Sequence, residues 1–290
     1  MKDLRNKFMK DYELYPSFFG YPEGVRKSDE EKRFPEFLQA YIECYGKDKL
    51  NEMEVEYNGV EKLIELLKSY SPTNKLTVIC MSPLHEIALI PVDLFPNMHI
   101  VAMNGGFEED PSKKTINIPK AGNNGGICPG ITDIVFKKLT ESKTAMTLIS
   151  SGLVRRKNCV LPLNIYNKWI KLLESDKVSK FTKAFFKDFE FCNHGNKLAN
   201  HKNLCDPLTL YLAIFGNYKS YKVKTTINCE LKILDYLKVS KEGNIFNMVH
   251  CEDYNTELVY DFNQNVCIDI VDRIENILFP YHKFQYPEKN

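Results

Sequence analysis

The sequence lacks any long hydrophobic run, and this absence limits where the chain can reside. No window approaches the roughly 20 consecutive apolar residues that a helix needs to cross a bilayer. The first residues, MKDLRNKFMK, are charged and have no apolar core, so they do not resemble a secretory signal peptide. We therefore expect a cytoplasmic protein with no membrane partner.

An excess of charge of one sign is also missing. The formal net charge is only +1 over 290 residues. A surface that binds nucleic acid through bulk charge is strongly basic, and this composition does not supply one. We expect no nucleic-acid partner.

Paired cysteine motifs are absent, although cysteine itself is not rare. The nine cysteines include no CxxC pair, and their odd number does not suit a complete set of disulfides. This usage excludes a zinc site of the common type. It is typical of small hydrophobic residues in a reducing compartment.

The sequence does contain an alternation of helical and strand patterns. Apolar residues recur at helical spacing over 60–70 and 129–139, and short apolar runs occupy 76–81, 98–103 and 145–150. This alternation predicts an α/β fold, with an open, mainly parallel sheet and helices on both faces. Strand-like segments over 221–259 and a helix over 268–278 predict a small β layer and a closing helix. A chain of this length with 43% hydrophobic residues can form one large domain or two small ones, and we expect one domain over 1–290.

The predicted strand at 98–103 ends abruptly in a segment rich in small and amide side chains. Asn104, Gly105 and Gly106 follow it directly, and Asn117 and Asn124 come later in the same region. Open α/β sheets bind ligands where the carboxyl ends of strands meet such loops. Neutral amides can hydrogen-bond hydroxyl-rich molecules without charge. The alternative is an ordinary surface loop, because Gly and Asn are also common turn residues.

Asp206 stands at the start of a second stretch of interest. It immediately precedes Pro207 and an apolar run over 208–215. Asp followed by Pro is a common helix start, so one interpretation of Asp206 is a helix N-cap. The other is a polar ligand at the sheet edge.

Three segments in combination resemble the inosine/uridine-preferring nucleoside hydrolase family. SPLHEIAL at 82–89 resembles the family's GPLTNIAL. HIVAMNGG and NIPKAGNNGGICPGITDIVF resemble its MGG and N-I-T-P-x-A-E-F-N-x-x-x-D-P-E-A-A-x-x-V-F motifs, and LCDPLTLYLAI resembles its HDPLA helix start. The resemblance covers about 55–278 and leaves 1–54 as a diverged region.

This resemblance implies a fold and a reaction. The fold is an open α/β sheet. The reaction is hydrolysis of the bond between ribose and base in purine and pyrimidine nucleosides, and a homo-oligomer is among the expected assemblies. A calcium ion holds the ribose hydroxyls and the attacking water in the family, a role that suits a hard cation with oxygen ligands.

The motifs assign roles to individual residues by position. Asp206 matches a metal-binding aspartate, and the main-chain carbonyl of Met81 matches another metal ligand. Asn117 and Asn124 match two asparagines that contact the ribose. Cys205 stands where the family has a substrate-binding histidine, and a thiol replaces imidazole poorly in protonating a leaving base.

Several family residues are missing. The Asp-rich motif D-T-D-x-G-x-D-D, which supplies the catalytic base and most calcium ligands, does not occur. Gly122 stands at the position of a ribose-binding glutamate, Asn123 at an apolar position, and Cys128 at an aspartate. The chain is therefore either an N-terminally incomplete hydrolase or a diverged relative, and the changes at Gly122 and Cys205 favour divergence.

We accordingly expect glycosidic hydrolysis to be weak or lost, and calcium not to bind tightly. The alternative functions are a catalytically inactive nucleoside-binding pseudoenzyme and a structural or interaction protein. An unrelated α/β protein is a further alternative.

Overall fold

The computed structural model describes residues 42, 59–105, 115–118, 124–125, 129–180, 182–183, 186, 202–228 and 245–280. Gly122, Asn123, Cys128 and almost all of the region 1–54 lie outside this set. The chain divides into two compact units, which are described separately below. The first takes in Glu56–Cys159 and Leu204–Gln264, and the second Val160–Asn203 and Asn265–Asn290. The single domain over 1–290 stays a prediction.

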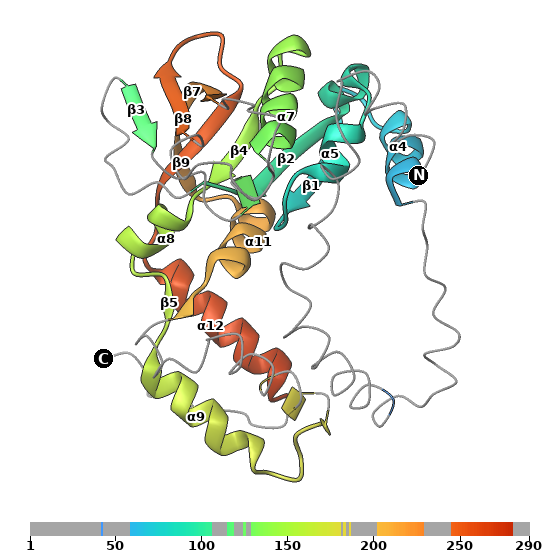
Figure 1. Cartoon of the computed structure of the whole chain (residues 1–290). Helices are drawn as coiled ribbons and strands as arrows, with labels where there is room; N and C mark the ends of the chain where they lie inside the picture. Colours follow the sequence, from blue (N-terminus) through green and yellow to red (C-terminus); the bar gives the residue numbers. More distant parts are fainter. Residues whose placement is uncertain are drawn as a thin grey trace, which may run out of the picture. The chain divides into compact units, whose positions relative to one another are not determined.

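A sheet of seven described strands forms the centre of the first unit, in the order β1-β2-β4-β9-β7-β8-β3 (Figure 1). The strands are β1 (Leu76–Cys80), β2 (Met98–Met103), β3 (Thr115–Ile118), β4 (Met146–Ile149), β7 (Tyr218–Asn228), β8 (Ile245–His250) and β9 (Thr256–Phe262). Neighbours from β1 to β9 pair in parallel, and β7, β8 and β3 are added antiparallel. The predicted parallel sheet is confirmed. The strands after 218 extend this same sheet.

Helices cover both faces of the parallel part. The first unit contains α4 (Gly59–Lys68), α5 (His85–Leu89), η2 (Val92–Asn97), α7 (Pro129–Glu141), α8 (Ser151–Arg156) and α11 (Cys205–Phe215). Alternate residues of β2, such as Ile100 and Ala102, join one buried cluster with α4, α5 and α7. Val101 and Met103 are buried outside that cluster, because successive side chains of a strand point to opposite faces. They lie on the strand that α11 packs against.

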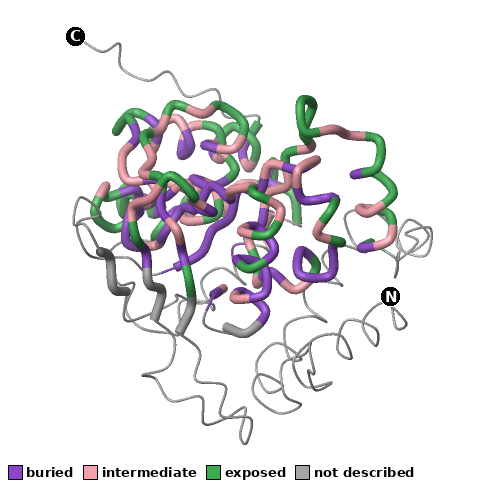
Figure 2. Tube along the Cα trace, turned by 90° about the horizontal axis from the view of Figure 1, so that it is seen from above, coloured by how far each residue is buried: buried purple, intermediate pink, exposed green. Residues whose placement is uncertain are grey.

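Burial follows this layering. The central strands β2 and β4 are buried along nearly all their length. Figure 2 draws buried stretches of the chain in purple. A strand covered on both faces reads as a continuous apolar run, which explains why MHIVAM shows little polar alternation. In α7, Ile131, Val135 and Leu139 recur every four residues and are each almost fully buried. This spacing makes the segment a helix with one face on the sheet.

The second unit is held by an aromatic cluster around a buried carboxylate. It contains β5 (Val160–Leu161), α9 (Leu163–Leu173), β6 (Lys202–Asn203) and α12 (Asn265–Leu278). The Trp169 ring lies 6.0 Å from Phe186 and 6.2 Å from Phe279. Trp169 Nε1 donates to Glu275 Oε2 at 2.7 Å, and Lys168 Nζ lies 3.0 Å from Oε1. Both oxygens of this buried carboxylate are therefore paired, as a buried charge requires.

Two further features of the described residues are the state of the cysteines and the length of the helices. The described cysteines are thiols and form no disulfide, and Cys80 and Cys159 are buried. No helix within the described ranges is long and apolar enough to cross a bilayer.

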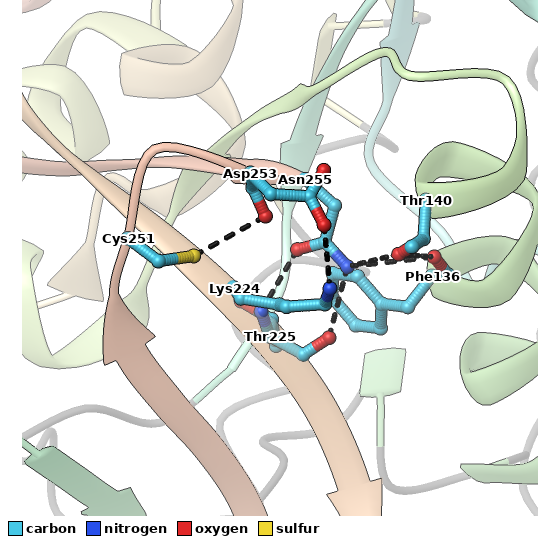
Figure 3. Close-up of polar contacts among 7 residues, drawn as sticks. All are labelled: Phe136, Thr140, Lys224, Thr225, Cys251, Asp253 and Asn255. Carbon is cyan, nitrogen blue, oxygen red and sulfur yellow. Dashed lines mark hydrogen bonds and ion pairs between the residues drawn. The ribbon is translucent and has the colours of Figure 1, made fainter.

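Asn255 links three elements at the start of β9 (Figure 3). Its Oδ1 accepts from Thr225 N at 2.8 Å, and its Nδ2 donates to Thr225 O and to Thr140 Oγ1, both at 3.0 Å. The side chain thus joins β7 to the end of α7. Asn255 is 1% exposed, so water cannot replace these hydrogen bonds if they are lost.

Replacing Asn255 with leucine should therefore lower the free energy of unfolding by about 3 kcal/mol, because several buried groups lose their partner. Urea unfolding followed by circular dichroism measures the change. Asp253→Asn is the matched control, since the ion pair between Lys224 and Asp253 at 2.7 Å is exposed and should matter little. Equal effects of the two substitutions would contradict the role given to Asn255.

Candidate functional site

The carboxyl ends of β1, β2 and β4 meet at one edge of the sheet. In-register parallel pairing places Met81, Asn104 and Ser150 just beyond the ends of these three neighbouring strands. Backbone hydrogen bonds continue past the strands: Asn104 N donates to Ile149 O at 3.0 Å, and Ser151 N donates to Gly105 O at 3.1 Å. This edge is where open α/β sheets bind ligands. We call it the carboxyl rim.

Helix α11 also reaches this part of the unit, because it packs on β1 and β2 (Figure 1). Its start is fixed by Leu204 N, which donates to Cys159 O at 3.0 Å. Leu204 occupies the N-cap position and makes no side-chain cap. Asp206 is therefore the second residue of the helix, so the interpretation of Asp206 as the N-cap is wrong.

Asn124 lies at the carboxyl rim and joins two strands there. Its Nδ2 donates to Met81 O at 3.1 Å and to Met103 O at 2.8 Å. These carbonyls follow β1 and end β2, so one amide ties the two strand ends together. Two carbonyl acceptors require the nitrogen to face them, which leaves Oδ1 as the acceptor for other groups. The structure thus brings Asn124 and Met81 together.

The Met81 carbonyl and Asp206 do not fit a tight calcium site. A calcium ion takes about six to eight oxygen ligands, and its affinity rises with their negative charge. Asp206 is the one carboxylate of this pair. The Met81 carbonyl is already engaged by the N–H donor of Asn124. The carbonyl oxygen keeps a second lone pair, but the amide protons beside it carry partial positive charge and make the position less favourable for a cation.

Asp206 and Cys205 stand side by side in the first turn of α11. The Asp206 side chain is open to solvent, although neighbouring protein atoms partly desolvate its carboxyl and raise its pKa. Burial, and then the charge of Asp206, raise the pKa of the Cys205 thiol to about 11. Arg155 acts in the opposite direction. Cys205 is therefore a neutral thiol at pH 7.

Asn117 lies far from these residues in the order of the sheet. It belongs to β3, where it pairs with Asn247 of β8. β4, β9, β7 and β8 stand between β2 and β3. Its placement gives no support to convergence with Asn124, so its contact with a ligand stays a prediction.

The family motifs give no role to Asn104, which the sequence shows only as one of several amide side chains after the strand at 98–103. This residue is 2% exposed, yet neither atom of its side-chain amide has a hydrogen-bond partner among the described residues. The signal in the sequence is its position, because an asparagine directly after a buried strand falls on the ligand-binding edge.

The double hydrogen bond of Asn124 generates a prediction about stability and pH. Asn124→Ala should lower the free energy of unfolding by about 1–3 kcal/mol, because two carbonyls lose their donor. Asn124→Asp should cost more at pH 7, since a carboxylate would face the same carbonyls. Its folded-state pKa would then lie above the ordinary value of about 3.9. The extra cost should therefore shrink as the pH falls through that raised pKa.

Urea unfolding of wild type, Asn124→Ala and Asn124→Asp between pH 7.5 and pH 4.5 measures this difference. All other titrating groups are shared, so the difference between Asn124→Asp and Asn124→Ala reports the new carboxyl. A difference that stays constant with pH would show that this amide does not face the two carbonyls.

Sequence comparison does not place the chain. No protein-family model matches it, and no curated protein matches its sequence. Structural comparison gives a clear result. A purine-preferring ribonucleoside hydrolase from Gardnerella vaginalis is 15% identical and superposes with a TM-score of 0.52, over 83% of this chain and 75% of that one. A plant nucleoside hydrolase is 11% identical with a TM-score of 0.54, over 79% and 70% of the two chains.

An inosine-uridine preferring nucleoside hydrolase from Bacillus anthracis is 18% identical with a TM-score of 0.45, over 74% of this chain and 64% of that one. The assignment of the fold rests on the first two structures, whose superpositions are the better ones. They share with this chain the α/β sheet that the three sequence motifs implied. This chain has the fold of the nucleoside hydrolases.

Proposed function

We propose that this chain binds a nucleoside at the carboxyl rim and hydrolyses its glycosidic bond weakly or not at all. The observation that carries the proposal is the hydrogen bond from Asn124 to the Met81 carbonyl. The motif resemblance gives that carbonyl to a metal ion, and here one of its two lone pairs accepts from the Asn124 amide.

Binding follows from the groups that remain at the rim. The Asn124 Oδ1 can accept a hydrogen bond from a ribose hydroxyl, because both N–H groups are used elsewhere. The carboxylate of Asp206 can accept a second one. In this proposal both residues orient the sugar. The calcium ion of the family would supply water activation when bound, and the donor set of Met81 and Asp206 does not favour its binding.

Weak or lost hydrolysis follows from the proton chemistry. A departing base needs a proton, and the neutral Cys205 thiol, with its pKa raised to about 11, gives one up poorly near pH 7. Neither Asn124 nor the Met81 carbonyl can take a proton from water. Of the described residues given a role here, Asp206 alone could act as a base.

The wider setting is also proposed. The near-neutral composition argues against a nucleic-acid partner, and the nucleoside of this proposal is a small-molecule partner. The cysteine usage supports a reducing compartment, and we place the protein in the cytoplasm. A homo-oligomer is the assembly to test by light scattering. The alternative function is that of a structural or interaction protein that binds no nucleoside.

Inosine and uridine should raise the melting temperature of the protein without being consumed, because a ligand of the native state stabilises it by mass action. Asp206→Asn should weaken the binding about tenfold, as expected for the loss of a charge-assisted hydrogen bond. Differential scanning fluorimetry measures the shift, and chromatography of free base measures turnover. The control is Asp253→Asn, an exposed substitution on the β8–β9 turn. Release of base well above background would refute the loss of hydrolysis, and no shift with either nucleoside would refute binding.

Calcium should not bind with micromolar or tighter affinity, because one carboxylate and one engaged carbonyl cannot offset dehydration of the ion. Calorimetric titration of the metal-stripped protein tests this expectation, and Asp206→Ala serves as the comparison. A 1:1 site that disappears in Asp206→Ala would show that other residues complete a calcium cage.

A further inference from the structure

Asn104 presents an unusual energetic situation. Its side chain is 2% exposed, and both its Oδ1 and its Nδ2 lack a hydrogen-bond partner within the described part of the chain. A buried polar group without a partner raises the free energy of the folded state by at least as much as one hydrogen bond lowers it. A residue that carries this cost calls for an explanation, such as a ligand that completes it.

Local fraying does not account for the unpaired amide. The backbone of the same segment is hydrogen-bonded at two points: Asn104 N donates to Ile149 O at 3.0 Å, and Gly105 O accepts from Ser151 N at 3.1 Å. The preceding carbonyl, that of Met103, accepts from Asn124. The main chain is thus held on both sides while the amide remains unsatisfied. Gly105 then turns with φ 80°, a conformation that glycine adopts readily.

The surroundings favour a particular class of ligand group. Asn104 follows Met103, whose carbonyl holds the Asn124 amide, so two carboxamides belong to the same strand end. A carboxamide offers one acceptor oxygen and two N–H donors without charge. Adjacent hydroxyls offer the complement, since each hydroxyl both donates and accepts. The 2′- and 3′-hydroxyls of a ribose form such a pair.

We propose that Asn104 and Asn124 form a sugar site that works without a metal ion, in which the two carboxamides hold the vicinal hydroxyls of a ribose. This inference rests on the proposed nucleoside binding and goes beyond it. The hydroxyls that a cation would hold are held by neutral amides. Asn124 accepts through Oδ1, and Asn104 both donates and accepts.

The proposal also accounts for the enclosure of Asn104. Protein atoms surround the amide, so a sugar reaches it only when those atoms move apart. When the surrounding atoms move apart, no hydrogen bond between the Asn104 side chain and the described residues is broken. The unpaired amide therefore lowers the free-energy cost of admitting the ligand, and the ligand restores the missing hydrogen bonds.

The test separates a ligand role from a structural one. Asn104→Leu removes the amide at similar volume, so the unliganded protein should be as stable as wild type or more stable. Uridine should nevertheless bind about tenfold more weakly, because two hydrogen bonds to the sugar are gone. Asn104→Ala is the second variant, in case leucine does not fit. Calorimetry gives the dissociation constant, and urea unfolding gives the stability.

Thr225→Val is the matched control. Thr225 Oγ1 is another buried atom without a hydrogen-bond partner among the described residues, and it lies on β7, outside the carboxyl rim. Valine in its place should also leave stability equal or higher, but uridine should bind as it does to wild type. This comparison distinguishes the loss of a sugar contact from the general effect of removing an unpaired polar atom.

Two ligand probes complete the experiment. 2′,3′-Dideoxyuridine should bind about tenfold more weakly than uridine to wild type and equally weakly to Asn104→Leu. Addition of EDTA should leave uridine binding unchanged. Equal binding of uridine to wild type and Asn104→Leu, or loss of binding with EDTA, would overturn the metal-free site while leaving the proposed function intact. Failure of wild type to bind uridine at all would instead overturn the proposed function.

Discussion

The parallel pairing of β2 between β1 and β4 is the constraint on which the first unit depends. β2 is buried on both faces, so its backbone groups must be satisfied by neighbouring strands. Because the pairing is parallel, the three strands run in one direction and their carboxyl ends lie at one edge. Each connecting helix must return the chain from the carboxyl end of one strand to the amino end of the next. The carboxyl rim is a consequence of this topology.

Polar groups at the rim are organised around main-chain carbonyls. The first carbonyl beyond β1 and the last of β2 both accept from Asn124, and Gly105 O accepts from the start of α8. Carbonyls that point out of a sheet edge can be satisfied by a cation or by N–H donors. In this chain the donors are amides. These donors, the Asn124 side chain and the Ser151 main-chain N–H, are uncharged.

The structure brings some of the residues matched by the motifs together and separates others. Asn124 and Met81 meet through a hydrogen bond of 3.1 Å, and Cys205 and Asp206 begin a helix that packs on β1 and β2. Asn117 lies on β3, across four intervening strands from β2. The sequence motif placed all of them together because a motif lists residues in order along the chain. Distance in space depends on which edge of the sheet each strand joins, and the motif does not encode that.

The sequence by itself determined the α/β class, the parallel strands at 76–81, 98–103 and 145–150, and the helix of α7. Each rests on a local pattern: continuous apolar runs for strands buried on both faces, and apolar residues at helical spacing for one buried helix face. Only the tertiary structure decided that the strands after 218 join the main sheet, that Asn124 engages Met81, and that the Asn104 amide has no partner among the described residues. These features depend on contacts between residues far apart in the chain. Local propensity cannot specify them, because strand order and the satisfaction of buried polar groups are set when the whole sheet assembles.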